Sequence, residues 1–366
     1  MVSLILPFAD TSMMNLFLEH VSRTFSEYFL VMQVDQAGWH RAKDLIIPEN
    51  VRLIPQPAYS PVLNRLTVEF AEWFPRGWYN TMSNERRMYW LMEWSGSIET
   101  KEEQMETIRS SDGTPIAYQR SGHGLPLIVV HGTGADHARW GPVLPALERS
   151  FTVYALDRRG RGKSGDTTPY ALEQEFEDIL AVIDSIPEPV FLLGHSYGAI
   201  CCLEAARRTT HVRKLVLYEP PLHLDTEHYS PQVLSKLQIL LDRGDREGAL
   251  VTFQQEIVRV PPHELALLRS SPSWSARIAA AHTLLRELRG ANAYVFEATR
   301  FRDLKTPTLL LLGEDSPAYF KTAIEAVHGA LSESQVRIMA GQQHAAINTA
   351  PELFTREVVE FLTHAD

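Results

Sequence analysis

Two patterns of hydrophobic and polar residues divide the chain. From Met105 onward, short apolar runs alternate with amphipathic stretches that have helical spacing. The apolar runs are PLIVV, FTVYAL, VFLLG, KLVLY, TLLLL and QVRIM, and the amphipathic stretches lie near 137–149, 171–184, 197–208, 318–331 and 351–363. Continuous apolar strands that alternate with helices predict a mostly parallel sheet covered on both faces. We therefore expect an α/β fold over residues 105–366.

Two departures from this alternation refine the prediction. The segments ETIRS and PIAYQR surround Asp112-Gly113, a dipeptide typical of the tight turn between antiparallel strands. Between about 221 and 302 only helix-like sequence appears. An insertion of that kind between two strands predicts a helical cap. Four of its apolar residues could line a pocket or form the cap's own core: Leu240, Leu241, Phe253 and Trp274.

The N-terminal part of the chain follows a different pattern. Helical spacing over 11–26 precedes an apolar stretch at 27–34 that predicts a buried strand, and a second strand is expected at Val51–Ile54. Residues 84–104 then switch abruptly between basic, aromatic and acidic composition. We interpret 84–104 as a junction between a unit at 1–83 and the α/β unit at 105–366.

Composition and charge indicate which partners the protein does not bind and where in the cell it is expected. A formal net charge of −10 over 366 residues argues against general electrostatic binding of nucleic acid or of anionic membranes. No apolar run of about 18 residues indicates a membrane-spanning helix. The N-terminus lacks the basic region and small-residue cleavage site of a secretory signal. We expect a cytoplasmic protein, and its oligomeric state stays open.

The sequence offers no pattern for a metal or a disulfide. The only cysteines, Cys201 and Cys202, are adjacent, and neighbouring residues of a helix cannot form an ordinary disulfide. We expect both to pack in a helix core. Spacings typical of zinc ligands are missing, so neither a metal nor another cofactor is expected.

The segment Gly194-His195-Ser196-Tyr197-Gly198 is the candidate catalytic motif. Gly-x-Ser-x-Gly alone is weak evidence, but here it follows the strand VFLLG and opens an apolar helix, the setting that a nucleophile elbow requires. Glycines suit this turn because it is strained and crowded. We expect Ser196 to be the nucleophile and the Tyr197 N–H to stabilise a developing oxyanion. His195 is expected to be a packing residue.

Three motifs together resemble the α/β-hydrolase superfamily over residues 105–366. They are His131-Gly132-Thr133-Gly134 after the strand PLIVV, the turn from Asp157 to Ser164, and the serine elbow, and they occur in the family's order and spacing. The resemblance implies that the Thr133 N–H is the second oxyanion donor and that His131 and Asp157 shape their loops. It also implies the triad order Ser, acid, His, which makes His344 the base.

Two carboxylates compete for the role of the triad acid. In the family the acid commonly lies three residues after the glycine that ends the strand TLLLLG, and here that position is Ser316. Asp315 lies one position earlier and is the preferred candidate. Glu219, at the end of the strand KLVLYE, is the alternative because some family members place the acid there. Either carboxylate could instead be solvated or cap a helix.

A serine nucleophile predicts cofactor-free acyl transfer through an acyl-enzyme, on a small ester, thioester, lactone or activated amide. It argues against the aspartate-nucleophile branches of the family, the haloalkane dehalogenases and epoxide hydrolases. The displaced acid leaves a second hypothesis, a non-catalytic ligand-binding protein with the same fold. A third hypothesis, DNA transposition, comes from the N-terminal part.

That part resembles the DDE-type insertion-sequence transposases of the mariner-like group. The resemblance rests on LVMQVDQAGWH and on SPVLNRLT, and it makes Asp35 the second acid of the family's ribonuclease H-like fold. The expected position of the third acid is Thr67, with Glu69 two residues later, and the strands that carry the first acid are missing. A lone Asp35 cannot hold two metal ions. We therefore interpret 1–83 as a truncated, inactive fragment of that α/β fold, fused to a hydrolase that begins at Met105.

Overall fold

In the computed structural model the chain forms two compact units, Met1–Glu102 and Glu103–Asp366, referred to below as unit 1 and unit 2. The structure describes residues 15, 18–19, 22–23, 30–34, 45–55, 105–222, 224, 229–260, 262–269 and 273–364. In unit 1, strand β1 (Leu30–Val34) pairs in parallel with β2 (Val51–Pro55), with Leu30 opposite Val51. Asp35 and the segment 60–67 lie outside the described residues, so the transposase-like fragment stays a prediction.

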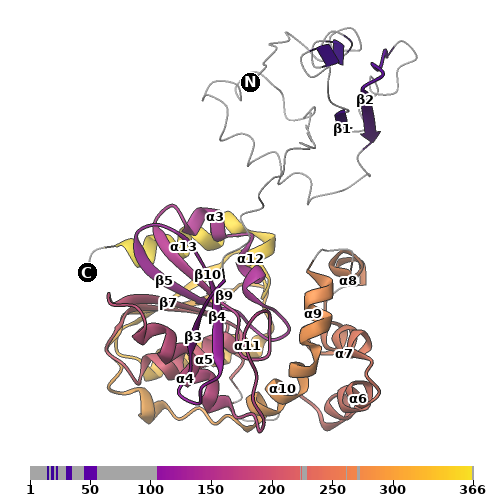
Figure 1. Cartoon of the computed structure of the whole chain (residues 1–366). Coiled ribbons are helices and arrows are strands. Elements are labelled where there is room, and N and C mark those ends of the chain that lie inside the picture. Colours follow the sequence, from indigo (N-terminus) through magenta and orange to yellow (C-terminus); the bar gives the residue numbers. More distant parts are fainter. Residues whose placement is uncertain are drawn as a thin grey trace. The chain divides into compact units, whose positions relative to one another are not determined.

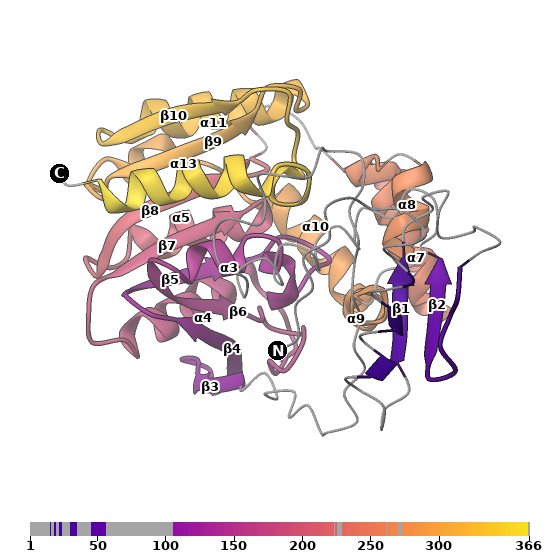
Figure 2. The ribbon, with the colours of Figure 1, turned by 90° about the horizontal axis from the view of Figure 1, so that it is seen from above.

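Unit 2 is built around an eight-stranded sheet with the order β10-β9-β8-β7-β5-β6-β4-β3 (Figure 2). Strand β4 is antiparallel to both β3 and β6, and every other neighbouring pair is parallel. The strands are β3 (Met105–Arg109), β4 (Pro115–Gly122), β5 (Leu125–Val130), β6 (Phe151–Leu156), β7 (Val190–His195), β8 (Val212–Tyr218), β9 (Thr308–Gly313) and β10 (Ser334–Met339). The mostly parallel sheet predicted from the apolar runs is confirmed.

The predicted hairpin at Asp112-Gly113 joins β3 to β4. Gly113 has φ +84°, a conformation that a residue without a Cβ adopts at little cost, and its N–H donates to Ser110 O at 2.9 Å. The Asp112 carboxylate accepts from the Thr114 N–H at 2.9 Å. These two bonds close the turn at the antiparallel edge of the sheet.

Helices cover both faces of the sheet because alternate strand residues point to opposite sides (Figure 1). On β5, Ile128 and Val130 pack toward α4 (Leu172–Asp184), α5 (Tyr197–Ala206) and α11 (Ala318–Ala330), whereas Leu127 and Val129 pack toward α3 (Leu144–Leu147) and α13 (Pro351–Thr363). Cys201 and Cys202 are free thiols buried in the α5 side of the core. The sheet interior is therefore apolar on both faces, as a parallel sheet requires.

Among the described residues between β8 and β9, five α-helices, named the cap helices here, gather beside the sheet (Figure 1). They are α6 (Pro231–Asp242), α7 (Arg246–Thr252), α8 (Pro262–Arg269), α9 (Trp274–Ala280) and α10 (Leu284–Ala293), with a π-helical segment at Phe253–Val258. Phe253 and Trp274 belong to the core of the cap, and Leu240 and Leu241 pack against it. Helix α10 joins the two parts, since Leu284 lies in the cap core and Ala291 in the core beneath the sheet.

The predicted helix near 137–149 is interrupted. It consists of a 3-10 turn, η3 (His137–Trp140), and the short α3, with Gly141 following the first. Further short helices are η5 (Ala281–Thr283), η6 (Ala298–Phe301) and α12 (Ala346–Thr349). The turn η3 begins three residues after the loop 131–134.

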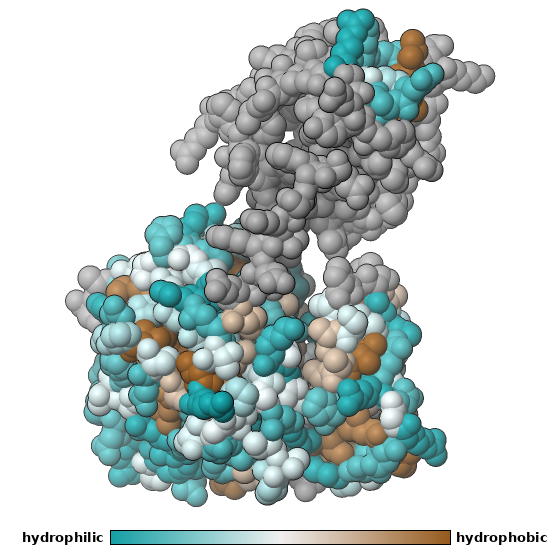
Figure 3. Space-filling view, viewed as in Figure 1, coloured by the Kyte–Doolittle hydropathy of each residue, from teal (hydrophilic) through white to brown (hydrophobic). Residues whose placement is uncertain are grey.

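The surface of unit 2 is mostly hydrophilic on the face shown in Figure 3, with hydrophobic residues scattered over it. The large apolar side chains that are exposed on unit 2 come from several elements: Leu125, Ile239, Val258, Val295, Tyr319, Val336 and Ile338. Among the described residues, no helix has both the length and the apolar character needed to cross a membrane.

Candidate active site

The serine elbow lies between β7 and α5 and has the strained backbone predicted for it. Ser196 has φ +55° and ψ −126°, a conformation that side-chain-bearing residues rarely adopt. A Cβ on Gly194 would lie 2.6 Å from Gly198 O, and one on Gly198 would lie 2.4 Å from Val130 O. Only glycine fits at these two positions, so the elbow motif follows from packing.

The loop 131–134 lies against this serine. A Cβ on Gly132 would lie 2.9 Å from Ser196 Cβ and 3.4 Å from Ser196 Oγ. Thr133, the next residue, is half-buried, and Tyr197 opens α5, where a first-turn N–H has no partner within the helix. Both residues expected to stabilise an oxyanion therefore belong to segments that border Ser196.

His344 is held by a carboxylate at the end of β8. Glu219 Oε2 accepts a hydrogen bond from His344 Nδ1 at 2.6 Å. Glu219 Oε1 accepts two more, from the Gly313 N–H at 2.7 Å and from Ser316 Oγ at 2.6 Å. The Glu219 side chain is completely buried, so these three donors replace the water that a carboxylate needs. The residue adopts φ +47°, which marks its backbone as strained.

This pairing corrects the preference for Asp315. Asp315 is exposed, and its backbone N–H donates to Gln342 O at 2.9 Å. The position usual for the acid holds Ser316, whose hydroxyl turns inward and donates to Glu219 instead. The structure thus pairs His344 with the alternative carboxylate, and Asp315 remains solvated beside it.

The backbone ties the serine and the histidine to one point of the sheet. The Ser196 N–H donates to Tyr218 O at 2.8 Å, and Glu219 is the next residue along the chain. The Tyr218 hydroxyl donates to Gln343 O and accepts from the Ala346 N–H at 3.1 Å, so it holds both sides of His344. The end of β8 therefore sets the position of the elbow and of the segment that carries His344 together.

Two rings hold the imidazole of His344. Phe320 stacks on it with a centroid distance of 4.5 Å and an interplanar angle of 14°, and the His195 ring lies 4.6 Å away at 37°. Burial, the nearby His344 and the charge of Arg139 lower the pKa of His195 well below its usual value. His195 is consequently neutral at pH 7. Its Nε2 lies 3.1 Å from the carbonyl oxygen of His344, to which it can only donate.

His131 and Asp157 occupy the loop positions expected from the sequence. Burial lowers the pKa of His131 well below its usual value, so the ring is neutral and its Nε2 accepts from the Arg158 N–H at 3.2 Å. Asp157 is buried and accepts from the N–H groups of His137 at 3.0 Å and Lys163 at 2.9 Å. The two side chains thus join the loops after β5 and β6.

A buried charge cluster supports the Tyr197 side of the site. The Arg158 guanidinium donates to both oxygens of Glu175 at 2.7 Å, and its carbon atom lies 4.6 Å from the Tyr197 ring centroid. Arg158 and Arg161 also contact Glu287 of cap helix α10. Burial by itself would raise the pKa of Glu175, but the two arginines hold it at about 2. Both arginines belong to the turn from Asp157 to Ser164, but that motif did not predict their partners, because Glu175 and Glu287 lie in separate helices.

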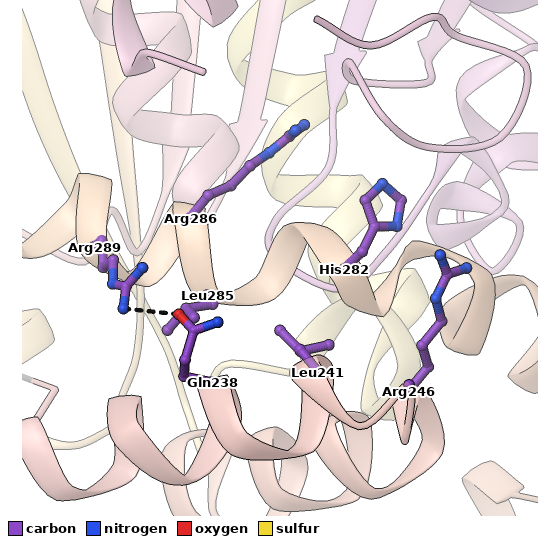
Figure 4. Close-up of a pocket in the computed structure, with 8 residues that line it drawn as sticks. Gln238, Leu241, Arg246, His282, Leu285, Arg286 and Arg289 are labelled. Carbon is purple, nitrogen blue, oxygen red and sulfur yellow. Dashed lines mark hydrogen bonds between the residues drawn. The ribbon is translucent and has the colours of Figure 1, made fainter. Parts of the chain in front are cut away.

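The cap carries a separate hollow of about 410 Å³ between α6 and α10 (Figure 4). Its lining includes Gln238, Arg246, His282, Arg286 and Arg289 but none of the residues around the elbow. Arg286 is engaged elsewhere, since it forms an ion pair with Asp166 at 2.7 Å. The hollow is thus distinct from the serine site. Within the described part of the chain, no cluster of three or more histidine, cysteine, aspartate or glutamate residues could hold a metal ion.

Comparison with known proteins fits this geometry. Residues 127–357 match the model of the alpha/beta hydrolase family. The chain belongs to this family. The crystal structure of an alpha/beta hydrolase from Sphaerobacter thermophilus is 36% identical, covers 70% of this chain and 100% of that one, and superposes with a TM-score of 0.63.

Two curated relatives are more distant in sequence. An (E)-2-((N-methylformamido)methylene)succinate hydrolase of Acinetobacter baylyi is 24% identical over 68% of this chain and 94% of its own length. A 2-(acetamidomethylene)succinate hydrolase of Mesorhizobium japonicum is 23% identical over 67% of this chain and 90% of its own length. Each similarity is confined to about two thirds of the chain, a share that unit 2 alone can accommodate.

Proposed function

We propose that unit 2 is a cofactor-free serine hydrolase that cleaves a small ester, thioester, lactone or activated amide. In this proposal Ser196 is the nucleophile, His344 the base and Glu219 the acid. The observation that carries it is the 2.6 Å contact between Glu219 Oε2 and His344 Nδ1, next to an elbow whose serine has φ +55°. Membership of a hydrolase family and relatives named for hydrolysis of small substrates support the same reaction class.

The first half of the reaction forms an acyl-enzyme. Ser196 Oγ attacks the acyl carbon while His344 Nε2 takes the hydroxyl proton, and the Nδ1–H bond to Glu219 stabilises the resulting imidazolium. The N–H groups of Thr133 and Tyr197 stabilise the oxyanion. The intermediate then collapses, the bond to the leaving group breaks, and His344 returns the proton to that group.

The second half releases the acid. Water attacks the acyl carbon as His344 takes one of its protons, and the bond to Ser196 Oγ breaks as the same proton passes to the serine. A carboxylate fixed at Nδ1 keeps the imidazole in the tautomer that leaves Nε2 free to accept a proton. Glu219, held by three donors, is suited to that role.

The rival hypothesis of a non-catalytic binding protein rested on the absence of an acid from its usual position. Glu219 provides a carboxylate at His344 from another strand, which favours catalysis over binding alone. The N-terminal fragment takes no part in the proposed reaction.

A panel of p-nitrophenyl esters of increasing acyl length, with lactones alongside, tests the proposal. We expect turnover by the wild type and a loss in kcat of about 10⁴ or more in Ser196→Ala and His344→Ala. His364→Ala, which changes an exposed histidine far along the chain from the elbow, is the matched control and should keep wild-type rates. Equal activity in the wild type and Ser196→Ala would refute the proposal.

A further inference from the structure

Two arginines flank the loop that borders Ser196. Arg277 of cap helix α9 donates from Nη1 to Gly134 O at 3.4 Å, one residue after Thr133. Arg139 belongs to η3, which follows the same loop, and its Nη1 donates to Asn348 Oδ1 of α12, the short helix after His344. The Arg277 guanidinium thus reaches the loop 131–134 from the cap, and the Arg139 guanidinium contacts the helix that follows His344.

Neither guanidinium is directly paired with a carboxylate. Among the described residues, neither Arg139 nor Arg277 forms an ion pair, although both are half-buried. The charge of Asp136 favours the protonated form of Arg277, but the two side chains form no ion pair, and the Asp136 carboxylate accepts from the Ala138 N–H at 3.1 Å. Burial and the nearby Arg277 charge lower the pKa of Arg139 to about 10. Burial also lowers the pKa of Arg277.

An anion placed beside these two guanidinium groups would offset both their lost hydration and their mutual repulsion. A guanidinium that has lost part of its hydration gains from a carboxylate through charge-assisted hydrogen bonds, and two like charges held near each other repel less when an anion lies between them. The cap hollow of Figure 4 offers a contrast. There Arg286 is paired with Asp166, whereas Arg246 and Arg289 are exposed to water.

We propose that Arg139 and Arg277 bind a carboxylate of the substrate, so that the hydrolase acts on small acyl compounds that carry a carboxylate near the scissile bond, such as a half-ester of a short dicarboxylic acid. This inference rests on the proposed function and specifies its substrate class. Asn348 positions the Arg139 guanidinium, and Gly134 O positions that of Arg277. The carboxylate would be held beside the oxyanion loop, with the acyl carbon at Ser196.

A matched pair of substrates tests this assignment. Monoethyl succinate carries the carboxylate, and ethyl pentanoate has a similar acyl length without it. We expect the wild type to show a kcat/KM for monoethyl succinate at least about tenfold above that for ethyl pentanoate. Arg139→Gln and Arg277→Gln should each lower kcat/KM for the half-ester by about 10–100-fold, mainly through KM, and leave ethyl pentanoate within about threefold.

Arg289→Gln, which removes a cation from the cap hollow, is the control and should keep the preference for the half-ester. No preference in the wild type, or equal losses on both esters in the two variants, would overturn the assignment. Titration calorimetry of succinate with Ser196→Ala tests the carboxylate site separately from the catalytic proposal. If no ester is hydrolysed, succinate binding that is lost in Ser196→Ala/Arg277→Gln still supports the site, and an absence of succinate binding refutes it.

Discussion

Glu219 and His344, 125 residues apart in the chain, meet through a 2.6 Å contact between Oε2 and Nδ1. The carboxylate follows β8, and the imidazole lies in the loop after β10, on the far side of β9 in the sheet order. Because parallel strands end at the same edge of a sheet, the two loops lie side by side there.

Glu219→Gln should lower kcat by about 10²–10⁴, because an amide cannot stabilise the imidazolium and can select the wrong tautomer. Asp315→Asn removes the exposed carboxylate nearby and should change kcat by no more than about twofold. Steady-state kinetics on one ester at a single pH compare the two. A larger loss in Asp315→Asn than in Glu219→Gln would contradict the pairing seen in the structure.

The serine elbow and His344 could be singled out from local sequence, but the choice between Asp315 and Glu219 as the partner of His344 could not be made from it. Gly194, Ser196 and Gly198 lie within five residues, and the glycines are imposed by backbone approaches of 2.4–2.6 Å. The acid depends on which strand end reaches His344, and that is a tertiary relationship. The sequence offered Glu219 only as the alternative to Asp315, and it placed Ser316 in the usual acid position, where the hydroxyl donates to Glu219.

In the fold, too, local sequence patterns predicted some features, whereas contacts between distant segments could not be predicted. Apolar runs predicted the strands of unit 2 from β5 onward, and the helix-like sequence between 221 and 302 matches the cap helices. Strands β5 to β9 are almost entirely buried, which gives continuous apolar runs, whereas the edge strand β10 leaves Val336 and Ile338 exposed. The Arg158–Glu175–Glu287 contacts could not be predicted, since charged residues of separate segments carry no periodic signal. For the same reason the sequence did not single out Arg139 and Arg277.

Gly198→Ala should destabilise unit 2, whereas Gly329→Ala should not. The new Cβ at 198 would lie 2.4 Å from Val130 O, and such overpacking costs about 1–3 kcal/mol, which outweighs the gain of up to about 1 kcal/mol for alanine in a helix. Nothing lies within 4 Å of a Cβ at 329 in α11, so only the gain applies there. Urea unfolding of the two variants measures both effects. An unchanged midpoint in Gly198→Ala would count against the close approach of α5 to β5.

Stability should fall as the pH drops below about 6.5. His131 and His195 are held neutral in the fold, with pKa values well below 6.5, while the unfolded chain gains both protons as the pH falls through that value. Each histidine therefore lowers the free energy of unfolding by up to about 1.4 kcal/mol per pH unit below 6.5. Above that pH its stabilising contribution is fully present. Urea unfolding between pH 7.5 and pH 5 measures this slope.

His195→Gln is the variant that isolates one of these groups. Glutamine keeps a donor for His344 O but does not titrate, so the slope should fall by up to about 1.4 kcal/mol per pH unit. A slope equal to that of the wild type would show that His195 takes up its proton in the folded state.

Residues 105–366 alone should fold and keep their activity, because unit 2 has its own sheet and cores. We expect a kcat/KM within about threefold of that of the full chain, as for a domain that folds independently. Far-ultraviolet circular dichroism and ester turnover of the truncated chain test this. Aggregation or a large loss of turnover would show that residues 1–104 are integral to the hydrolase.

Covalent labelling tests the central claim most directly. A fluorophosphonate reacts with a serine only when that serine is activated by its base, and the phosphonyl group then stays on the oxygen. Intact-mass spectrometry of the full chain should show a single adduct that peptide mapping assigns to Ser196. The adduct should be absent from Ser196→Ala and should form more slowly in Glu219→Gln. A wild-type protein that stays unlabelled, or a Ser196→Ala variant labelled as readily as the wild type, would contradict the assignment of Ser196 as the nucleophile.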